Sequence, residues 1–491
     1  MSEVNILGVV GAGPMGAGIA QIGLTSGLDV ILFDLSPDAR AKAGKDIKGR
    51  ITRLVEKGML PDGSTETMMA RLTLASDLAA FAPAQAVVEA IIERLEPKQK
   101  LFADLEAIVA PDAILATNTS SLSVAAIAAH CTHKERVCGL HFFNPVPLMK
   151  LVEVITAPGT SAAIAERATA LSKAIDKVPV TVKDGPGFLV NLQGRAYAQE
   201  GLAIVQEGVA EPVVIDRIMR DAAGFRMGPF ELMDLTGIDV NYAASTYIYE
   251  GYQHDPRLKT TTLHALMAAA GRFGRKTGQG FFSYAAEAIG FPASPEATAS
   301  PPEIKPALGE AAPEFEALAE RAGWEQGNDV TLIAPIGEDC ATACARLGLD
   351  PNTTVAIDFT AFAADHLTVM AAVGGRSTAE SVADWLRSKG LWVEVIGDSP
   401  GFVLQRMLAM VANLGCELAQ IGVGTPRDID IAMKLAQNYP KGPIEWGEWL
   451  GIAKTHLIMQ QLQAITGSDR YRPSLWLRRR AQLGLSLYEV G

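Results

Sequence analysis

Two residues, His141 and Glu153, could form a proton-transfer pair. His141 ends one predicted strand, a proline-rich turn at 144–147 follows, and a second predicted strand carries Glu153. If the strands pair around that turn, the carboxylate can bind one imidazole nitrogen and leave the other free to accept a proton. Oxidation of a secondary alcohol needs such a base, because loss of hydride from carbon must be matched by loss of the hydroxyl proton. A lone histidine in this place would more often be structural.

Two further polar residues occupy places suited to binding a substrate. Ser120 follows a predicted strand in the segment 117–122, and Asn191 ends the segment DGPGFLVN at 184–191. Open α/β sheets bind ligands outside the carboxyl ends of their strands, so Ser120 is expected at the ligand edge. Taken alone, Ser120 would more often be a helix cap.

The first forty residues predict a nucleotide site that would position this chemistry. An apolar run at 4–10 leads into a G-x-G-x-x-G motif, and a helical pattern follows it. The first glycine permits the tight turn, the second lets the backbone approach a pyrophosphate, and the third lets the helix pack on the strand. The helix N-terminus supplies amide donors to the phosphates. The predicted cofactor-binding residues of this turn are Gly11, Gly13, Pro14, Met15 and Gly16.

Asp34 indicates which dinucleotide is bound. It ends a second apolar run, 30–33, about 20 residues beyond the glycines. A carboxylate there can accept both ribose hydroxyls and repels a 2′-phosphate, which favours NAD over NADP.

Strand and helix patterns then alternate. Apolar runs at 86–92, 113–116 and 137–143 read as strands, with a helix at 97–109. We therefore expect an α/β fold with an N-terminal Rossmann doubly wound sheet over 1–185.

The rest of the chain contains a duplication. Landmarks of a helical domain at 186–284 return 214 residues later, so that Pro186-Gly187-Phe188 recurs as Pro400-Gly401-Phe402. This predicts a second helical copy over 398–491. Between the copies we expect an Ala/Pro/Glu-rich linker at 285–314 and a degenerate Rossmann-like segment at 315–397.

The second half lacks the chemistry of the first. Asn191 maps onto Gln405, and no matching His/Glu pair precedes the second copy. The sequence at 334–337, Ala-Pro-Ile-Gly, replaces the glycine motif. We therefore expect one active site per chain and no nucleotide in the second half.

Together, the glycine motif, NTSSL, HFFNPVPLMKLVEV and DGPGFLVN resemble the 3-hydroxyacyl-CoA dehydrogenase family over residues 4 to about 284. The resemblance implies NAD-dependent oxidation of (3S)-3-hydroxyacyl-CoA to 3-oxoacyl-CoA. It makes His141 the base and Glu153 its orienting partner, with Ser120 and Asn191 binding the substrate. It also implies cofactor contacts from Glu93, Lys98, Asn118, Ser120, Asn144 and Lys276.

The resemblance also bears on coenzyme A and the acyl group. Lys57 and Arg50, in the helical region after Asp34, would lie near the CoA phosphates, although relatives have serine in place of Arg50. The two-copy layout most resembles bacterial 3-hydroxyadipyl-CoA and 3-hydroxybutyryl-CoA dehydrogenases of phenylacetate degradation; fatty-acid catabolism is the other setting. An adipyl carboxylate would call for a basic residue. The candidates are Arg195, Arg217, Arg220, Arg226 and Arg257.

Two alternatives stay open at this point. Relatives with the same scaffold oxidise sugar acids such as gulonate without CoA, and a non-catalytic NAD-binding structural protein would belong to a different class altogether. Joint presence of the four polar residues described above disfavours the latter.

Composition excludes other classes. Lysine and arginine total 43 against 55 acidic residues, a net charge of −12, which disfavours nucleic acid as a partner. No apolar run is long enough to predict a membrane span. The N-terminus shows no basic leader, and five scattered cysteines suit free thiols, so we expect a cytoplasmic protein without a metal site. The chain would be either a homodimer or a monomer whose helical copies form an intrachain pseudo-dimer.

Overall fold

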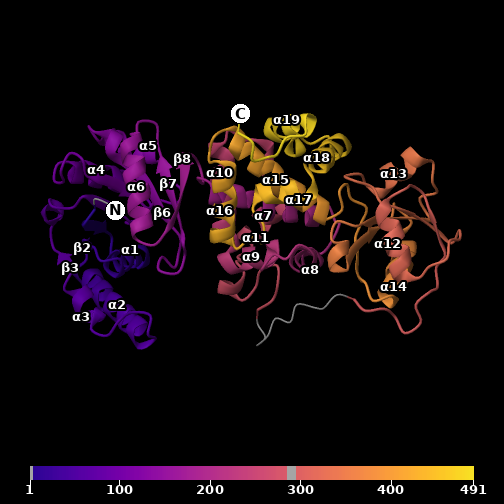
Figure 1. The fold of residues 1–491 in the computed structure, drawn as a ribbon, viewed down its shortest axis with the longest axis horizontal. Coiled ribbons are helices and arrows are strands. Elements are labelled where there is room, and N and C mark those ends of the chain that lie inside the picture. Colours follow the sequence, from indigo (N-terminus) through magenta and orange to yellow (C-terminus); the bar gives the residue numbers. More distant parts are fainter. Residues whose placement is uncertain (1–3, 285–294, 491) are drawn as a thin grey trace. The chain divides into compact units, whose positions relative to one another are not determined.

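The structure is a computed structural model that describes residues 4–284 and 295–490. The chain forms two compact units (Figure 1). The first contains the residues up to 192 together with 422–437, and the second contains 193–421 and the residues from 438 onward.

The first unit is built on an eight-stranded sheet of order β3-β2-β1-β4-β5-β6-β7-β8. All neighbouring strands are parallel except the β6–β7 pair. The strands are β1 (Ile6–Val10), β2 (Asp29–Phe33), β3 (Leu72–Ala75), β4 (Ala86–Glu89), β5 (Ile114–Thr117), β6 (Val137–Phe142), β7 (Leu151–Thr156) and β8 (Val178–Lys183). This confirms the predicted Rossmann doubly wound sheet.

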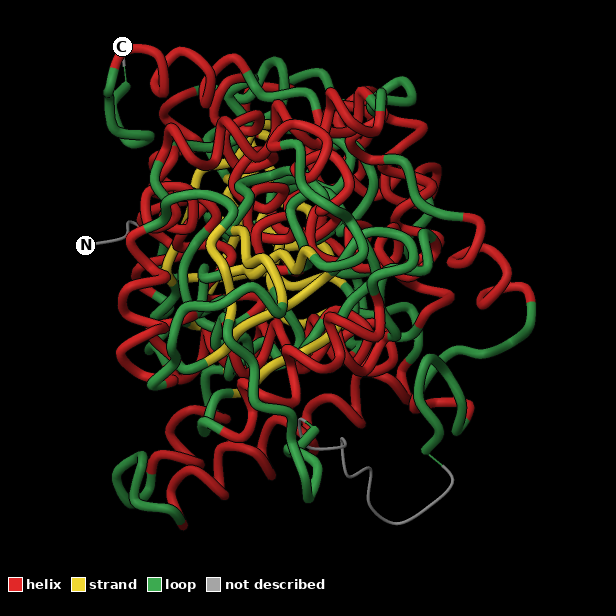
Figure 2. Tube along the Cα trace, turned by 90° about the vertical axis from the view of Figure 1, so that its right-hand side faces the viewer, coloured by secondary structure: helices red, strands yellow, loops and turns green. Residues whose placement is uncertain are grey.

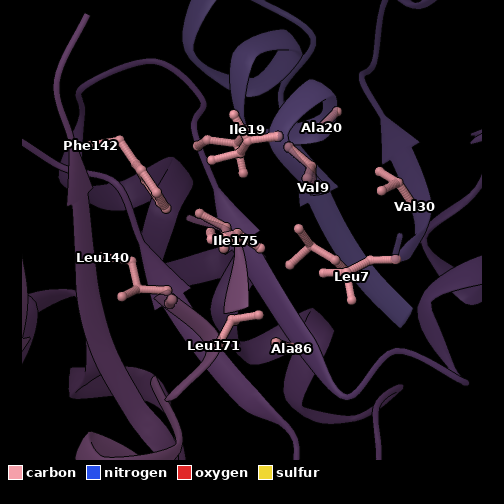
Figure 3. Close-up of a cluster of buried hydrophobic side chains, with 14 of the residues drawn as sticks. Leu7, Val9, Ile19, Ala20, Val30, Ala86, Leu140, Phe142, Leu171 and Ile175 are labelled. Carbon is pink, nitrogen blue, oxygen red and sulfur yellow. The ribbon is translucent and has the colours of Figure 1, made fainter. Parts of the chain in front are cut away.

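Helices cover this sheet. They are α1 (Pro14–Thr25), α2 (Pro37–Glu56), α3 (Ser64–Met69), α4 (Leu95–Glu106), α5 (Val124–Ile127), α6 (Ala162–Ala174), the start of α7 (Val190–Gln206), and α16 (Pro426–Gln437). The strand residues Leu7 and Leu140 pack with Ile19 of α1 and Leu171 of α6 in one apolar cluster (Figure 3). Each such fully buried side chain contributes about 1.5–3 kcal/mol. The cluster therefore fixes the strand ends that carry the polar residues.

The predicted strands are present, with two differences. The run at 86–92 ends as a strand at Glu89, because the chain turns away before α4. Two strands, β3 and β8, were not predicted. β3 has only four residues, and β8 alternates buried and exposed residues, so neither has the long apolar run of a central strand.

The second unit combines helices with a smaller sheet. Its helical part includes most of α7, then α8 (Pro212–Arg217), α9 (Pro229–Thr236), α10 (Ile238–Gly251), α11 (Thr262–Ala269), α15 (Leu404–Gln420), α17 (Pro443–Leu450), α18 (Ile452–Thr466) and α19 (Leu475–Leu483). The sheet contains β9 (Pro306–Leu308), β10 (Val330–Ile333), β11 (Thr354–Asp358), β12 (His366–Met370) and β13 (Trp392–Val395), with α12 (Pro313–Ala322), α13 (Cys340–Leu347) and α14 (Arg376–Ser388). Figure 2 distinguishes the strands of both sheets from the helices.

This smaller sheet is the predicted degenerate Rossmann-like segment. Its order is β13-β12-β11-β10-β9, and β11 pairs with β12 in the antiparallel sense. The predicted linker, 285–314, differs from expectation in its second part. Residues 285–294 lie outside the described residues, but 306–308 form β9, which pairs with β10. The sheet therefore begins inside the segment whose composition suggested a linker.

The duplicated helical domain repeats backbone conformation as well as sequence. Phe188 and Phe402 both have positive φ, 48° and 52°. The helix caps Gly228 and Gly442 have φ/ψ of −69°/168° and −68°/167°. Equal dihedral angles at a spacing of 214 residues confirm that the second copy keeps the fold of the first. Among the described residues, no helix is long and apolar enough to cross a membrane.

Candidate active site

His141 and Glu153 face each other across neighbouring strands. They are directly paired in the antiparallel register of β6 and β7, and Nδ1 of His141 lies 2.6 Å from Oε2 of Glu153. Glu153 is fully buried and His141 is nearly so. The pairing around the 144–147 turn is therefore as the sequence predicted.

Glu153 is fixed by a second set of contacts. Its Oε1 accepts hydrogen bonds from the backbone N–H groups of Leu189 (3.0 Å) and Val190 (2.9 Å), where α7 begins. A carboxylate is favoured at a helix N-terminus, so these amides offset the cost of burying its charge. The carboxylate thus holds the imidazole orientation rigidly.

The other imidazole nitrogen is available for chemistry. Within the described residues, Nε2 of His141 has no hydrogen-bond partner, whereas Nδ1 is bound to Glu153. The rings of Phe143 and Phe188 lie 4.5 and 5.8 Å from the imidazole centroid. With Nδ1–H donated to the carboxylate, Nε2 is the proton acceptor.

Ser120 and Asn191 come together beside this pair in the chain's first unit. Nδ2 of Asn191, in the first turn of α7, donates to the carbonyl oxygen of Ser120 at 3.5 Å. Ser120 is exposed just beyond the carboxyl end of β5. The helix that begins at Glu153 therefore also brings an amide side chain to the serine turn.

Asp184 is a residue for which the sequence suggested no role. Its carboxylate accepts hydrogen bonds from the Ser123 hydroxyl and the Ala125 N–H group, both at 2.9 Å. It thereby ties the end of β8 to the helix that follows the Ser120 turn. A serine helix cap at 123 and an aspartate directly after a strand were the available signals.

The glycine motif has one open position. Gly11 has φ +109°, and a Cβ there would lie 2.4 Å from the Ala90 carbonyl oxygen. A Cβ on Gly16 would lie 1.8 Å from the Gly11 carbonyl oxygen, whereas nothing lies within 4 Å of a Cβ on Gly13. The chain itself therefore requires two of the glycines, and the space over the third can take a ligand. Pro14 and Met15 form the first turn of α1 beside it.

Asp34 joins the loops that follow β1 and β2. Its Oδ2 accepts from the Ala12 N–H group (2.8 Å) and its Oδ1 from that of Ser36 (2.9 Å). Asp34 remains partly exposed, so the carboxylate has lone pairs left for a ribose diol. The open space at Gly13 and this carboxylate fit the two ends of an adenosine diphosphate.

Glu93 and Lys98 form a partly buried network under the serine turn. Nζ of Lys98, which is 1% exposed, lies 2.6 Å from Glu89 and 3.1 Å from Glu93. Glu93 also accepts from the Thr119 hydroxyl (2.6 Å) and the Ser120 N–H group (2.9 Å). Burial opposes ionisation of Glu93, but the Thr119 hydrogen bond and the Lys98 charge outweigh it and hold the pKa at about 2.

The remaining predicted cofactor residues lie in three places. Oδ1 of Asn118 accepts from the Phe142 N–H group (2.9 Å), which ties β5 to β6, and Asn144 is exposed in the turn after β6. Lys276 belongs to the second unit, where it pairs with Asp239. The structure thus groups Asn118 and Asn144 with the first sheet and places Lys276 on the helical domain.

A cationic cavity of about 710 Å³ lies beside the predicted CoA residues. Arg50, Arg53 and Lys150 line it, together with Pro14 and Asn144. Lys57 is exposed just beyond α2 and is not part of the lining. The structure therefore supports a role in anion binding for Arg50 more directly than for Lys57.

The five arginines considered for an acyl carboxylate all belong to the second unit. Arg195 donates to the Ser245 hydroxyl (2.8 Å), Arg217 pairs with Glu394 (2.8 Å) and Arg220 lies 3.7 Å from Glu231. Arg226 is exposed, and Arg257 lines a separate cavity.

Family models match both parts of the chain. The model of the 3-hydroxyacyl-CoA dehydrogenase NAD-binding domain matches residues 6–185, and that of its C-terminal domain matches 187–284 and again 401–487. The chain belongs to the 3-hydroxyacyl-CoA dehydrogenase family. This dehydrogenase is 37% identical over 487 residues to 3-hydroxyadipyl-CoA dehydrogenase of Escherichia coli K12, covering 98% of each chain. The predictions of family and fold are confirmed.

Two further comparisons support this assignment. A probable 3-hydroxybutyryl-CoA dehydrogenase of Deinococcus radiodurans is 40% identical over 277 residues, which cover 56% of this chain and 99% of that one. The crystal structure of 3-hydroxybutyryl-CoA dehydrogenase from E. coli K12 superimposes with a TM-score of 0.88 at 37% identity, covering 98% of this chain and 99% of that one. The chain is thus an NAD-dependent oxidoreductase of 3-hydroxyacyl-CoA, as predicted.

Proposed function

We propose that this dehydrogenase oxidises (3S)-3-hydroxyadipyl-CoA to the 3-oxo thioester. The observation that carries this choice is the match over 98% of both chains to an enzyme named for that substrate, because that match includes the duplicated half. 3-Hydroxybutyryl-CoA is the second candidate, favoured by the name of the matching crystal structure.

His141 is the proposed catalytic base. Its Nε2 takes the proton of the C3 hydroxyl group, and the Glu153 carboxylate on Nδ1 stabilises the imidazolium that forms. When bound, NAD supplies the hydride acceptor. Ser120 and Asn191 hold the C3 oxygen and the neighbouring thioester. In the reverse direction the imidazolium returns the proton to the forming alkoxide.

The cofactor and CoA would be held by separate residue sets. Backbone amides of the turn at 11–16 bind the pyrophosphate, and Asp34 binds the adenosine ribose. Arg50, with Arg53 and Lys150 beside it, attracts the phosphates of CoA. Glu93, Lys98, Asn118, Asn144 and Lys276 complete the proposed cofactor contacts, and Lys57 the CoA contacts.

The second helical copy is proposed to replace a partner subunit. In the first unit, α16 packs on β7 and β8, and the Lys183 N–H group donates to the Val423 carbonyl oxygen (2.9 Å). In the second unit, Gln193 of α7 donates to the Val411 carbonyl oxygen of α15 (2.9 Å). These contacts support an intrachain pseudo-dimer and the five predicted domains, and five buried free thiols support a cytoplasmic location. Light scattering on the full chain should then give the mass of a monomer.

Steady-state NAD reduction tests the substrate. We expect a higher kcat/KM with (3S)-3-hydroxyadipyl-CoA than with (3S)-3-hydroxybutyryl-CoA, and no turnover of L-gulonate. Preference for the butyryl ester would contradict the choice of acyl group. Turnover of gulonate alone would contradict a CoA substrate.

A further inference from the structure

A donor-rich cavity lies in the second helical copy, away from any residue of the proposed mechanism. Its volume is about 460 Å³, within the range of small-molecule pockets. It is formed by the end of α15, by α18, by the segment that enters α19, and by the turn at 256–258 (Figure 1). The lining residues that carry N–H donors are Arg257, Gln420, His456, Gln460, Gln463, Arg472 and Arg478.

Only one carboxylate, Glu417, lines this cavity. Arg257 is 3% exposed; it lies 3.5 Å from Glu417 and 3.1 Å from Asp255, and its Nε is buried without a hydrogen-bond partner among the described residues. Arg472 lies 3.9 Å from Asp255. Two carboxylates therefore orient two arginines and leave donors unused.

Arg478 adds positive charge that nothing nearby offsets. No ion pair forms at its guanidinium within the described part of the chain, and its side chain is exposed. Its effect reaches His456, whose pKa is lowered first by burial and then by the charge of Arg478. Nε2 of His456 is also buried without a partner among the described residues. The cavity is a local exception in a chain of net charge −12.

This donor set is not inherited from the repeated domain. At the positions 214 residues before His456, Arg472 and Arg478, the first copy has Tyr242, Leu258 and His264. The arginines are therefore particular to the second copy and are not needed to build the fold.

We propose that this cavity is a binding site for a small molecule carrying a multiply charged oxyanion. Planar guanidinium groups bind phosphate and carboxylate oxygens through paired hydrogen bonds, and three glutamine side chains can satisfy further oxygens or hydroxyl groups. A phosphate ester and a molecule with clustered carboxylates both supply this chemistry. The site is separate from the NAD and acyl-CoA sites and independent of the acyl group proposed above.

Isothermal titration calorimetry of the full chain tests the site, with inorganic phosphate and citrate as the two probes in low-salt buffer. We expect one binding event per chain, and the tighter probe identifies the phosphate or carboxylate class. Arg478→Ala should weaken binding by about tenfold or more. Arg479→Ala is the matched control, because its side chain is a neighbouring exposed arginine outside the lining and the net charge changes equally.

Three outcomes would overturn the inference. Neither probe binds at millimolar concentration, or both arginine variants weaken binding equally, which indicates general charge attraction. In the third, saturating NAD or CoA displaces the probe, which assigns the cavity to the known ligands. Because Arg257 is buried and its loss could unfold the domain, His456→Gln is the second variant, and it should weaken binding without lowering the Tm.

Discussion

The carboxylates after β2 and β11 show how the two sheets have diverged. Asp34 and Asp358 hold the same place, at the end of the second Rossmann strand. Each accepts from the backbone N–H group two residues ahead, at 2.9 and 3.0 Å respectively. The second oxygen of Asp34 accepts from Ala12, but that of Asp358 is buried without a partner among the described residues.

One residue explains the difference. Ala12 is the second residue after β1, and its counterpart, the second residue after β10, is Pro335, which has no N–H group to donate. In addition, Gln405 occupies the position of Asn191, and its longer side chain donates to Asp358 (3.0 Å) and accepts from Gly337 (3.0 Å). A scaffold thus loses a nucleotide site when side chains occupy its ligand edge, while the sheet itself persists.

The largest effect is expected at His141. His141→Gln should lower turnover by roughly 10²–10⁴-fold, because a positioned base is lost, and it should leave NAD affinity unchanged. Stopped-flow NAD reduction and NAD titration measure the two quantities. Asp358→Asn, in the second half, is the control and should retain parental turnover. Parental turnover in His141→Gln would mean that the base lies elsewhere.

NAD stoichiometry sharpens the comparison of the two sheets. We expect one NAD per chain by calorimetry. Asp34→Ala should weaken it by about ten- to a hundredfold, since a charge-assisted hydrogen bond to a diol is worth about 1.5–3 kcal/mol. Asp358→Ala should not change NAD affinity. A second NAD bound per chain would contradict the loss of the site in the smaller sheet.

The glycines of the first turn separate binding from folding. A side chain at Gly13 meets open space, so Gly13→Val should weaken NAD binding and leave the Tm unchanged. A side chain at Gly16 would meet the Gly11 carbonyl oxygen at 1.8 Å, so Gly16→Ala should lower the Tm by several degrees, a cost of about 1–3 kcal/mol. Equal melting temperatures for both variants would show that the turn relaxes without cost.

The sequence was informative where chemistry depends on residue type and spacing. The glycine motif, Asp34 and the His141–Glu153 register follow from local patterns, and the structure shows that geometry. It could not show that Glu153 caps α7 or that Asp184 anchors the Ser120 turn, because both contacts join segments whose separation in space is set by tertiary packing. Nor could it find β9, since a three-residue edge strand has no pattern distinguishable from a linker.

The smallest effect concerns acid stability, where the two halves should respond with opposite sign. The folded pKa of Glu93 is about 2, below its ordinary value of 4.5, so its stabilisation is present above pH 4.5 and is lost as the pH falls toward 2. Burial raises the pKa of Asp398 to about 6 from 3.8, so the folded state gains stability relative to the unfolded state as the pH falls from 6 to 3.8. Urea unfolding of Glu93→Gln should show a shallower loss below pH 4.5, and Asp398→Asn should lack the gain between pH 6 and 4. Both carboxyl groups accept backbone hydrogen bonds, so the pH slopes of the variants, and not their absolute stabilities, carry the comparison. Parallel slopes for the parent and Asp398→Asn would show that this carboxyl group does not differ between the folded and unfolded states.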